Sequence, residues 1–251
     1  MNIVINPTPV ALGEAAARQA AQVLNKAIQE KGKARLILST GMSQFETLQA
    51  LLASDVDWSK VEMFHLDEYI DLPVSHPASF RKYLNERFIS KISLKAVHLV
   101  NGEGDLDATI RTLSEAVSAE PVDLGLIGIG ENAHIAFNDP PADFETEQPY
   151  IIVKLDENCK KQQVREGWFP DLEHVPARAI SMSVRQILKC KTIISCVPHA
   201  VKANAVRLAL ESPVSNTVPA SILKTHPDVT LYLDEASAAD LSPELSQAGT
   251  R

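Results

Sequence analysis

The feature that most constrains the fold is an alternation of short apolar runs with longer helical patterns along the chain. The expected strands are 35–38, 61–66, 97–100, 123–129, 179–182, 192–197 and 229–233. The expected helices, with apolar residues at i, i+3 and i+4, are 11–30, 44–52, 77–88, 106–119 and 200–210. Strands that are apolar almost throughout need cover on both faces. The pattern predicts a three-layer αβα, Rossmann-like α/β fold, with a mostly parallel twisted sheet and helices on both faces.

The length of 251 residues suits one α/β domain spanning 1–251. The least regular stretch, 138–150 (NDPPADFETEQPY), is rich in proline and carboxylates. A long loop inside a compact domain is usually functional or mobile. We therefore expect a lid or loop region around 138–170, with a solvated acidic loop as the alternative.

The charge and hydropathy of the chain narrow the kind of partner it can have. A net charge of −8 disfavours nucleic acid and anionic membranes, but not a small anionic ligand held by a local field. No stretch approaches the ~18 apolar residues of a membrane span, and the first residues do not form a signal peptide. An odd number of cysteines argues against a disulfide framework. We expect a cytoplasmic protein that binds a small molecule.

Polar residues that directly follow predicted strands carry the most functional information, because ligands bind at the carboxyl ends of parallel strands. The first such group is Thr40, Gly41, Met42 and Ser43. Glycine permits close approach of the backbone, and the helix that follows offers free N–H groups to an anion such as phosphate. The alternative is that Ser43 only caps the helix, with Glu46 completing a capping box.

Two adjacent carboxylates, Asp67 and Glu68, follow the strand expected at 61–66. Burying an ionised carboxylate costs free energy unless the group has a charged or hydrogen-bonding partner, so buried carboxylates often have a function. In a partly dry cleft, one of the pair would have a raised pKa and suit a general base. A surface turn is the alternative interpretation.

A glycine-rich turn, GIGENAHIAFND, delivers His134 among the polar residues Glu131, Asn132 and Asp139. Histidine titrates near neutrality and needs an oriented partner to act as acid or base. Tight packing alone would also explain the glycines. Lys202 opens the helix after the strand at 192–197, where a cation opposes the helix dipole unless it faces a bound anion. A solvated lysine is the alternative there.

Cofactor fingerprints are incomplete in this sequence. GIGENA lacks the third glycine of the dinucleotide pattern, and no P-loop lysine follows Gly41. Histidine, cysteine and acidic residues show no ligand spacing typical of a catalytic metal. We expect neither a cofactor nor a metal.

The blocks STGMS, HLDEYIDLPVSHPASF, GLIGIGENAHIAFNDP and SILKTHPDVTLYLDEAS occur in an order that resembles the glucosamine-6-phosphate deaminase family. The similarity covers nearly the whole chain. The related 6-phosphogluconolactonases share the glycine–histidine turn but usually lack the Asp-Glu-Tyr block and the Phe-Asn after the histidine.

The resemblance implies roles for individual residues. Asp67 matches the base that moves a proton between C2 and C1 of the open sugar, and His134 matches the ring-opening histidine. The segment 40–43 and Lys202 match the phosphate site. Arg165 is the nearest match for a phosphate-binding arginine.

Three positions depart from the family pattern. Met42 stands where members commonly have glycine, Asn132 where they have aspartate, and Asp139 where they have glutamate. An amide cannot stabilise an imidazolium by charge, although Glu131 next to it could. We expect Asn132, with Asp139 or Glu131, to orient His134.

The resemblance therefore implies an enzyme of amino-sugar metabolism that converts glucosamine 6-phosphate and water to fructose 6-phosphate and ammonia. One alternative is a lactonase acting on 6-phosphogluconolactone. Another is a non-catalytic phosphosugar sensor, which Asn132 in place of a carboxylate would suit. The sequence leaves open a homo-oligomer and the gluco or galacto configuration of the substrate.

Overall fold

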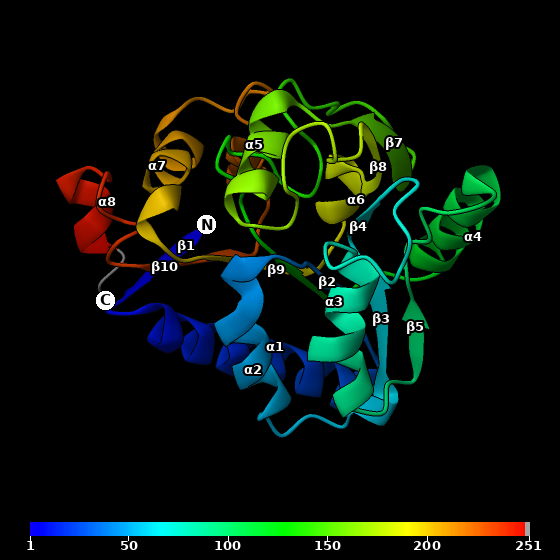
Figure 1. Cartoon of the computed structure of the whole chain (residues 1–251). Coiled ribbons are helices and arrows are strands. Elements are labelled where there is room, and N and C mark those ends of the chain that lie inside the picture. The colour runs from blue at the N-terminus through cyan, green and yellow to red at the C-terminus, as the bar shows by residue number, and fades with distance from the viewer. Residues whose placement is uncertain (249–251) are drawn as a thin grey trace.

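The computed structural model describes residues 1–248 and contains a large and a small β-sheet (Figure 1). The strands are β1 (Asn2–Asn6), β2 (Ala34–Leu38), β3 (Val61–His65), β4 (Asp67–Tyr69), β5 (Ala96–His98), β6 (Leu124–Ile127), β7 (Tyr150–Lys154), β8 (Arg178–Met182), β9 (Thr192–Val197) and β10 (Val229–Asp234). The large sheet has seven strands in the order β1-β10-β9-β6-β2-β3-β5, and all of its neighbouring strands pair in parallel.

Helices connect these strands as parallel pairing requires. They are α1 (Pro9–Lys31), α2 (Phe45–Leu52), α3 (Phe80–Arg87), α4 (Leu106–Ser118), α5 (Glu157–Arg165), α6 (Val184–Ile187), α7 (Ala203–Glu211) and α8 (Pro243–Ala248). Helix α1 shows the local signals plainly: Thr8 caps its first turn, proline occupies its first position, and Gly32 ends it with φ +74°.

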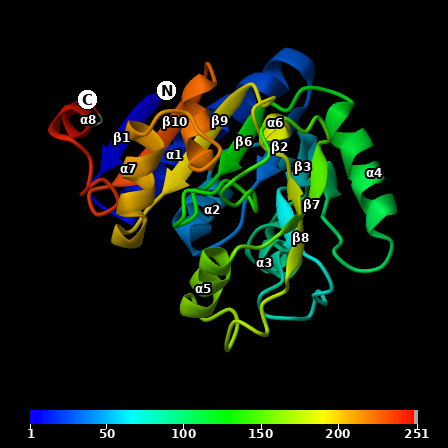
Figure 2. The ribbon, with the colours of Figure 1, turned by 90° about the horizontal axis from the view of Figure 1, so that it is seen from above.

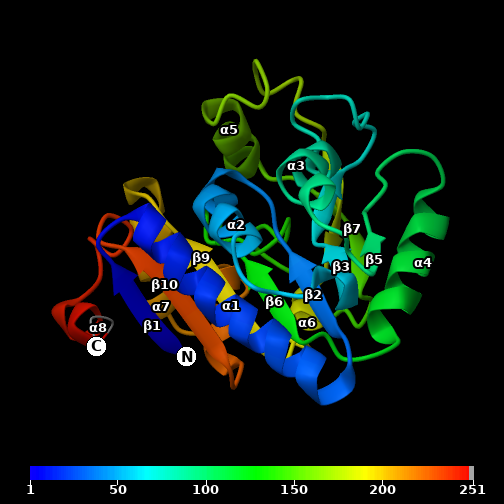
Figure 3. The ribbon, with the colours of Figure 1, turned by 90° about the horizontal axis from the view of Figure 1, so that it is seen from below.

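The two faces of the large sheet are covered by different helices. Apolar residues of α1, α2 and α3 form one buried cluster with the sheet, and those of α4, α6 and α7 form another. Seen from below, α1 crosses the sheet face (Figure 3), whereas α6 and α7 lie over the opposite face (Figure 2). The mostly parallel three-layer fold predicted from the sequence is confirmed.

The strand expected at 179–182 is β8, but it does not join the large sheet. It forms a small antiparallel sheet with β4 and β7, in the order β4-β8-β7. The sequence pattern could not separate the two sheets, because β8 is as apolar as a central parallel strand. The small sheet carries Asp67 at the start of β4, directly after β3 ends.

Part of the segment 138–170 lies beside the cavity described below, and part does not. Residues 162, 163, 165, 166 and 168, in and after the last turn of α5, line that cavity. Residues 138, 139, 141–143, 148 and 151–154 border a separate hollow of about 420 Å³. Lid motion and a single domain over 1–251 stay predictions, and residues 249–251 lie outside the described range. None of the helices in residues 1–248 is long and apolar enough to cross a membrane.

Candidate active site

A cavity of about 480 Å³ opens at the carboxyl ends of β2, β3, β6 and β9. This is the edge at which a parallel sheet presents its ligands. Most of the predicted site residues line it: Thr40, Gly41, Met42, Ser43, Asp67, Glu131, His134, Arg165 and Lys202. The other two, Asn132 and Asp139, are not among the lining residues but contact His134.

The loop after β2 turns sharply through Gly41, whose φ of +104° favours glycine. A short 3₁₀ turn, Met42–Gln44, follows. The loop is fixed from outside, because the Tyr83 hydroxyl donates to the Gly41 carbonyl at 2.8 Å. The Gln44 side chain donates to the carbonyl of Cys196 at 3.1 Å.

The capping alternative for this loop is wrong. Ser43 lies inside the 3₁₀ turn, and α2 begins after Gln44 without a side-chain cap. The Ser43 hydroxyl instead accepts a hydrogen bond from the Gln44 amide at 3.0 Å. The side chain of Met42 is 42% exposed, so it is not part of the buried core beneath the loop.

Lys202 ends the short 3₁₀ turn after β9 and is only 4% exposed. Burial lowers the pKa of its ammonium, while the charges of Glu166 and Glu131 act in the opposite direction. Within residues 1–248, no carboxylate lies within 4.0 Å of that ammonium. A buried cation that lines a cavity without an ion pair is suited to receive an anion.

The two carboxylates after β3 have different surroundings. Asp67 lines the cavity, and burial together with the adjacent Glu68 charge raises its pKa well above the usual value. Glu68 is fully buried and holds the start of α3, accepting hydrogen bonds from the Ser79 hydroxyl and from the backbone of 80 and 81. Asp67 is therefore the carboxylate free to act on a ligand.

The turn that carries His134 is defined by its backbone. Gly130 donates to the His134 carbonyl at 2.9 Å, and both Ala133 and Ala136 have positive φ. Asn138 fastens the far end of the turn to β8 by donating to the Met182 carbonyl at 2.9 Å. A turn held in this way positions the imidazole at the cavity edge.

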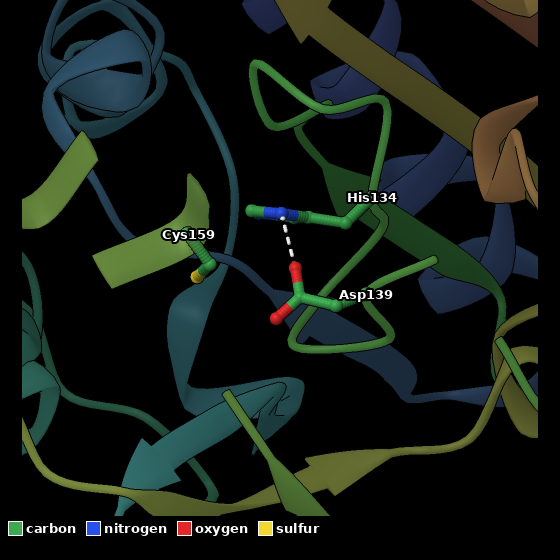
Figure 4. Close-up of side chains that lie close together, drawn as sticks. All are labelled: His134, Asp139 and Cys159. Carbon is green, nitrogen blue, oxygen red and sulfur yellow. Dashed lines mark ion pairs between the residues drawn. The ribbon is translucent and has the colours of Figure 1, made fainter. Parts of the chain in front are cut away.

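His134 meets Asp139 rather than Glu131. Its Nδ1 lies 2.9 Å from Oδ1 of Asp139. Figure 4 marks this contact with a dashed line. Burial would raise the pKa of Asp139, but its interactions with His134, with the backbone of 156 and with Asn132 outweigh burial and lower it. The expected partner Asn132 accepts the backbone N–H of His134 and donates to Asp139, and does not touch the ring nitrogens. Asp139 is therefore the carboxylate in contact with the imidazole, and its orienting role stays a prediction.

Glu131 and Arg165 form an ion pair at the cavity wall. The further lining residues that sequence reasoning missed include Gln162, Gln163, Glu166 and Trp168. The signal was present in the concentration of polar groups and tryptophan in QQVREGW. The arrangement of that segment is set by contacts such as the 3.0 Å hydrogen bond from Trp168 to Glu166.

One group in residues 1–248 brings three potential metal ligands together: His134, Asp139 and Cys159, whose ligand atoms lie within 4.8 Å of one another (Figure 4). Burial and the nearby Asp139 charge raise the pKa of the Cys159 thiol, which disfavours the thiolate that a metal needs. Asp139 already accepts hydrogen bonds from Asn132 and residue 156. The absence of a metal stays a prediction.

The fold and this cavity together define an α/β enzyme whose site suits a small anionic substrate. The family model described as glucosamine-6-phosphate isomerases/6-phosphogluconolactonase matches residues 7–232. The chain therefore belongs to this family.

Curated relatives match nearly end to end. A glucosamine-6-phosphate deaminase of Oenococcus oeni is 36% identical over 228 residues, which cover 90% of this chain and 94% of that protein. One of Listeria monocytogenes is 36% identical over 227 residues, covering 90% and 95%.

Solved structures agree with the fold. A monomeric glucosamine-6-phosphate deaminase superposes with a TM-score of 0.87 at 32% identity, over 96% of this chain and all of the other. A 6-phosphogluconolactonase of Shewanella baltica has a TM-score of 0.74 at 20% identity, over 93% and 97% of the two chains. At that identity, the second likeness speaks for the fold alone.

Proposed function

We propose that this protein is a glucosamine-6-phosphate deaminase, which converts glucosamine 6-phosphate and water to fructose 6-phosphate and ammonia. The observation that carries the proposal is that Asp67, His134 and Lys202 line one cavity although they follow three different strands. Relatives named as this enzyme, matched over 90% of the chain, support the same reaction.

The phosphate of the substrate binds between the 40–43 loop and Lys202. The loop offers backbone N–H groups at the start of a 3₁₀ turn, and Lys202 offers a buried positive charge. Arg165, now paired with Glu131, is a second cation within reach of the cavity. Holding the phosphate fixes the sugar for the chemistry at C1 and C2.

His134 opens the sugar ring by exchanging a proton with the ring oxygen. Asp139 occupies the Nδ1 side of the imidazole, so Nε2 is the nitrogen that meets the substrate. Asp139 also stabilises the imidazolium that forms. This carboxylate argues against the sensor alternative, which rested on an amide at position 132.

Asp67 removes the proton from C2 of the open-chain sugar and returns it to C1. The transfer turns the C2–N bond into an imine, and water then replaces the nitrogen to give the ketone and ammonia. A base with a raised pKa suits the abstraction of a proton next to a carbonyl. Neither proton transfer needs a hydride acceptor.

The test is a coupled measurement of ammonia and fructose 6-phosphate from glucosamine 6-phosphate, alongside hydrolysis of 6-phosphogluconolactone. We expect deaminase turnover in the wild type and a loss of about 10³-fold or more in Asp67→Asn. A lactonase needs no C2 base, so a lactonase would hydrolyse the lactone and tolerate Asp67→Asn. A folded protein that binds fructose 6-phosphate but turns over neither substrate would support the sensor and overturn the proposal.

Galactosamine 6-phosphate, assayed in parallel, tests the sugar configuration. Location in the cytoplasm and the oligomeric state stay predictions, for cell fractionation and for light scattering respectively. One structural neighbour is a monomeric deaminase, so we expect the single chain to be active.

A further inference from the structure

The side chain of Asn132 bridges two carboxylates. Its Nδ2 donates to Oδ1 of Asp139 at 3.0 Å and to Oδ2 of Asp156 at 3.2 Å. Its Oδ1 accepts the backbone N–H of His134 at 3.2 Å. Both amide hydrogens and the carbonyl oxygen are used, which fixes the amide in one orientation.

Asp156 makes contacts in two directions. Its backbone N–H donates to Oδ2 of Asp139 at 3.0 Å, so both oxygens of Asp139 are held. Its own Oδ1 caps α5 by accepting the backbone N–H groups of Asn158 and Cys159. The same residue thus begins a helix and braces the partner of His134.

We propose that Asp156 is a positioning residue, which sets the orientation of the His134–Asp139 pair and ties that pair to helix α5. The inference rests on the deaminase function proposed above. Helix α5 ends at Arg165, and its last two turns carry Gln162 and Gln163 into the cavity wall. Asp156 therefore links helix α5, which forms part of the cavity wall, to Asp139, the residue in contact with the imidazole.

The charges of the two aspartates explain why an amide lies between them. Asp139 and Asp156 are like charges on either side of Asn132, and the two amide hydrogens offset their repulsion. An aspartate at position 132 would place three carboxylates together with no hydrogen between them. The Cys159 thiol near Asp139 is kept neutral by burial. Asp139 therefore supplies the negative charge in contact with His134, and Asp156 supplies a second one on the far side of Asn132.

The variant Asp156→Asn isolates this role. An asparagine still caps α5 through its oxygen and leaves the backbone N–H to Asp139 in place, but it turns an amide nitrogen toward the Asn132 amide. We expect kcat to fall about tenfold or more, with KM changed less than about threefold. The changed hydrogen bonding around Asp139 should also shift the nitrogen resonances of the labelled His134 imidazole, measured by NMR at one fixed pH.

Asp105→Asn is the matched control. Asp105 caps α4 through the same kind of contact, accepting the Ala108 N–H at 2.9 Å, and has no place in the cavity. We expect kcat and the His134 imidazole resonances to stay at their wild-type values there. Asp156→Ser keeps a capping oxygen but is too short to reach Asn132, so it should repeat the loss of kcat if Asp156→Asn folds poorly.

A reciprocal exchange separates positioning from a merely structural role. Asn132→Asp alone should lower kcat, because it brings three carboxylates together. The double variant Asn132→Asp/Asp156→Asn lets the new amide donate to the new carboxylate, so kcat should recover at least about fivefold over Asn132→Asp alone. It should stay below the wild type, because the new carboxylate at position 132 and that of Asp139 still face each other without a hydrogen between them. No recovery over Asn132→Asp, or an Asp156→Asn variant with wild-type kcat and wild-type His134 imidazole resonances, would overturn the proposal.

The NMR measurement does not depend on turnover. If the wild type releases no ammonia, the proposed function fails, but the His134 imidazole resonances in Asp156→Asn still decide the role of Asp156. Shifted resonances then support the positioning role, and unchanged resonances refute it.

Discussion

The imidazole of His134 lies directly against Gly130: a Cβ atom at that glycine would come within 2.2 Å of Nε2. Gly130 also donates its N–H to the His134 carbonyl, so the glycine and the histidine close one turn. The glycine is needed for space rather than for backbone conformation, since its φ is not among the positive values.

Gly130→Ala should therefore move the imidazole and lower kcat about 10- to 100-fold, because small misplacements of a catalytic group are expensive. KM should change little, since the proposed phosphate contacts at residues 40–43 and Lys202 lie elsewhere in the cavity. Steady-state kinetics with glucosamine 6-phosphate give both values. Gly104→Ala, where nothing lies within 4 Å of the added Cβ, should lose about 1 kcal/mol of stability to its φ of +77° but keep kcat. Equal losses of kcat in both variants would contradict this account.

Asp67 should destabilise the folded protein as the pH rises. Its folded-state pKa is raised above the unfolded value, so the folded state binds more protons between the two. The free energy of unfolding then decreases from about pH 4 up to the folded-state pKa. Asp67→Asn removes this slope and should be more stable than the wild type at pH 7, by about 1 kcal/mol or more. Urea unfolding at pH 4, 5.5 and 7 measures the difference.

Asp240→Asn, at an exposed site, should leave the unfolding free energy unchanged at each pH, within about 0.5 kcal/mol. If Asp67→Asn proves less stable than the wild type at pH 7, then contacts in the folded protein stabilise the ionised Asp67 carboxylate, and its pKa is not raised by burial.

The sequence was sufficient for six of the seven strands of the large sheet and for bringing the candidate site residues to one edge of it. Alternation of apolar strands with helices predicts parallel pairing, and parallel pairing places residues 40–43, Asp67, His134 and Lys202 at one edge. Local signals sufficed because each of these residues lies within seven positions of the end of its strand.

Contacts between distant segments could not be predicted in the same way. Strand β8 is as apolar as a parallel strand, and its place beside β4 and β7 depends on the path of the loop after His134. Asp156 is recognisable as a possible helix cap, but nothing local indicates its hydrogen bond to Asn132, 24 residues away. Strand β1 was missed because its role depends on pairing with β10 at the other end of the chain.

Lys202→Met should separate phosphate binding from stability. Loss of a charge-assisted contact should weaken binding of fructose 6-phosphate about 30- to 100-fold in calorimetry. The free protein should be as stable as the wild type or more so, because a buried cation is removed. In the wild type, affinity should fall as the pH rises through the lowered pKa of Lys202, since the ammonium then loses its proton.

Lys26→Met, on an exposed surface of α1, should keep the wild-type affinity. A Lys202→Met variant that binds as the wild type does would show that the phosphate lies elsewhere in the cavity.

Glu131→Gln should strengthen phosphosugar binding about two- to fivefold. The change frees Arg165 from its ion pair, and it removes a negative charge from the surroundings of Lys202. The gain is small because Arg165 is half exposed and such pairs contribute about 1 kcal/mol or less. The pH dependence of kcat should not change, because Asp139 rather than Glu131 meets the imidazole. A shifted pH profile in Glu131→Gln would instead make Glu131 a partner of His134.

The phosphate loop offers a last test, in which backbone and side chain are separated. If backbone N–H groups grip the phosphate, Met42→Gly should leave the affinity for fructose 6-phosphate within about threefold, since the side chain is 42% exposed. Gly41→Ala should weaken binding about tenfold or more. A Cβ at Gly41 meets nothing within 4 Å, so this loss would come from the φ of +104° alone, which an alanine can relieve only by moving the loop. If Met42→Gly instead binds fructose 6-phosphate more weakly than Gly41→Ala does, the methionine side chain rather than the backbone N–H groups would bind the phosphate.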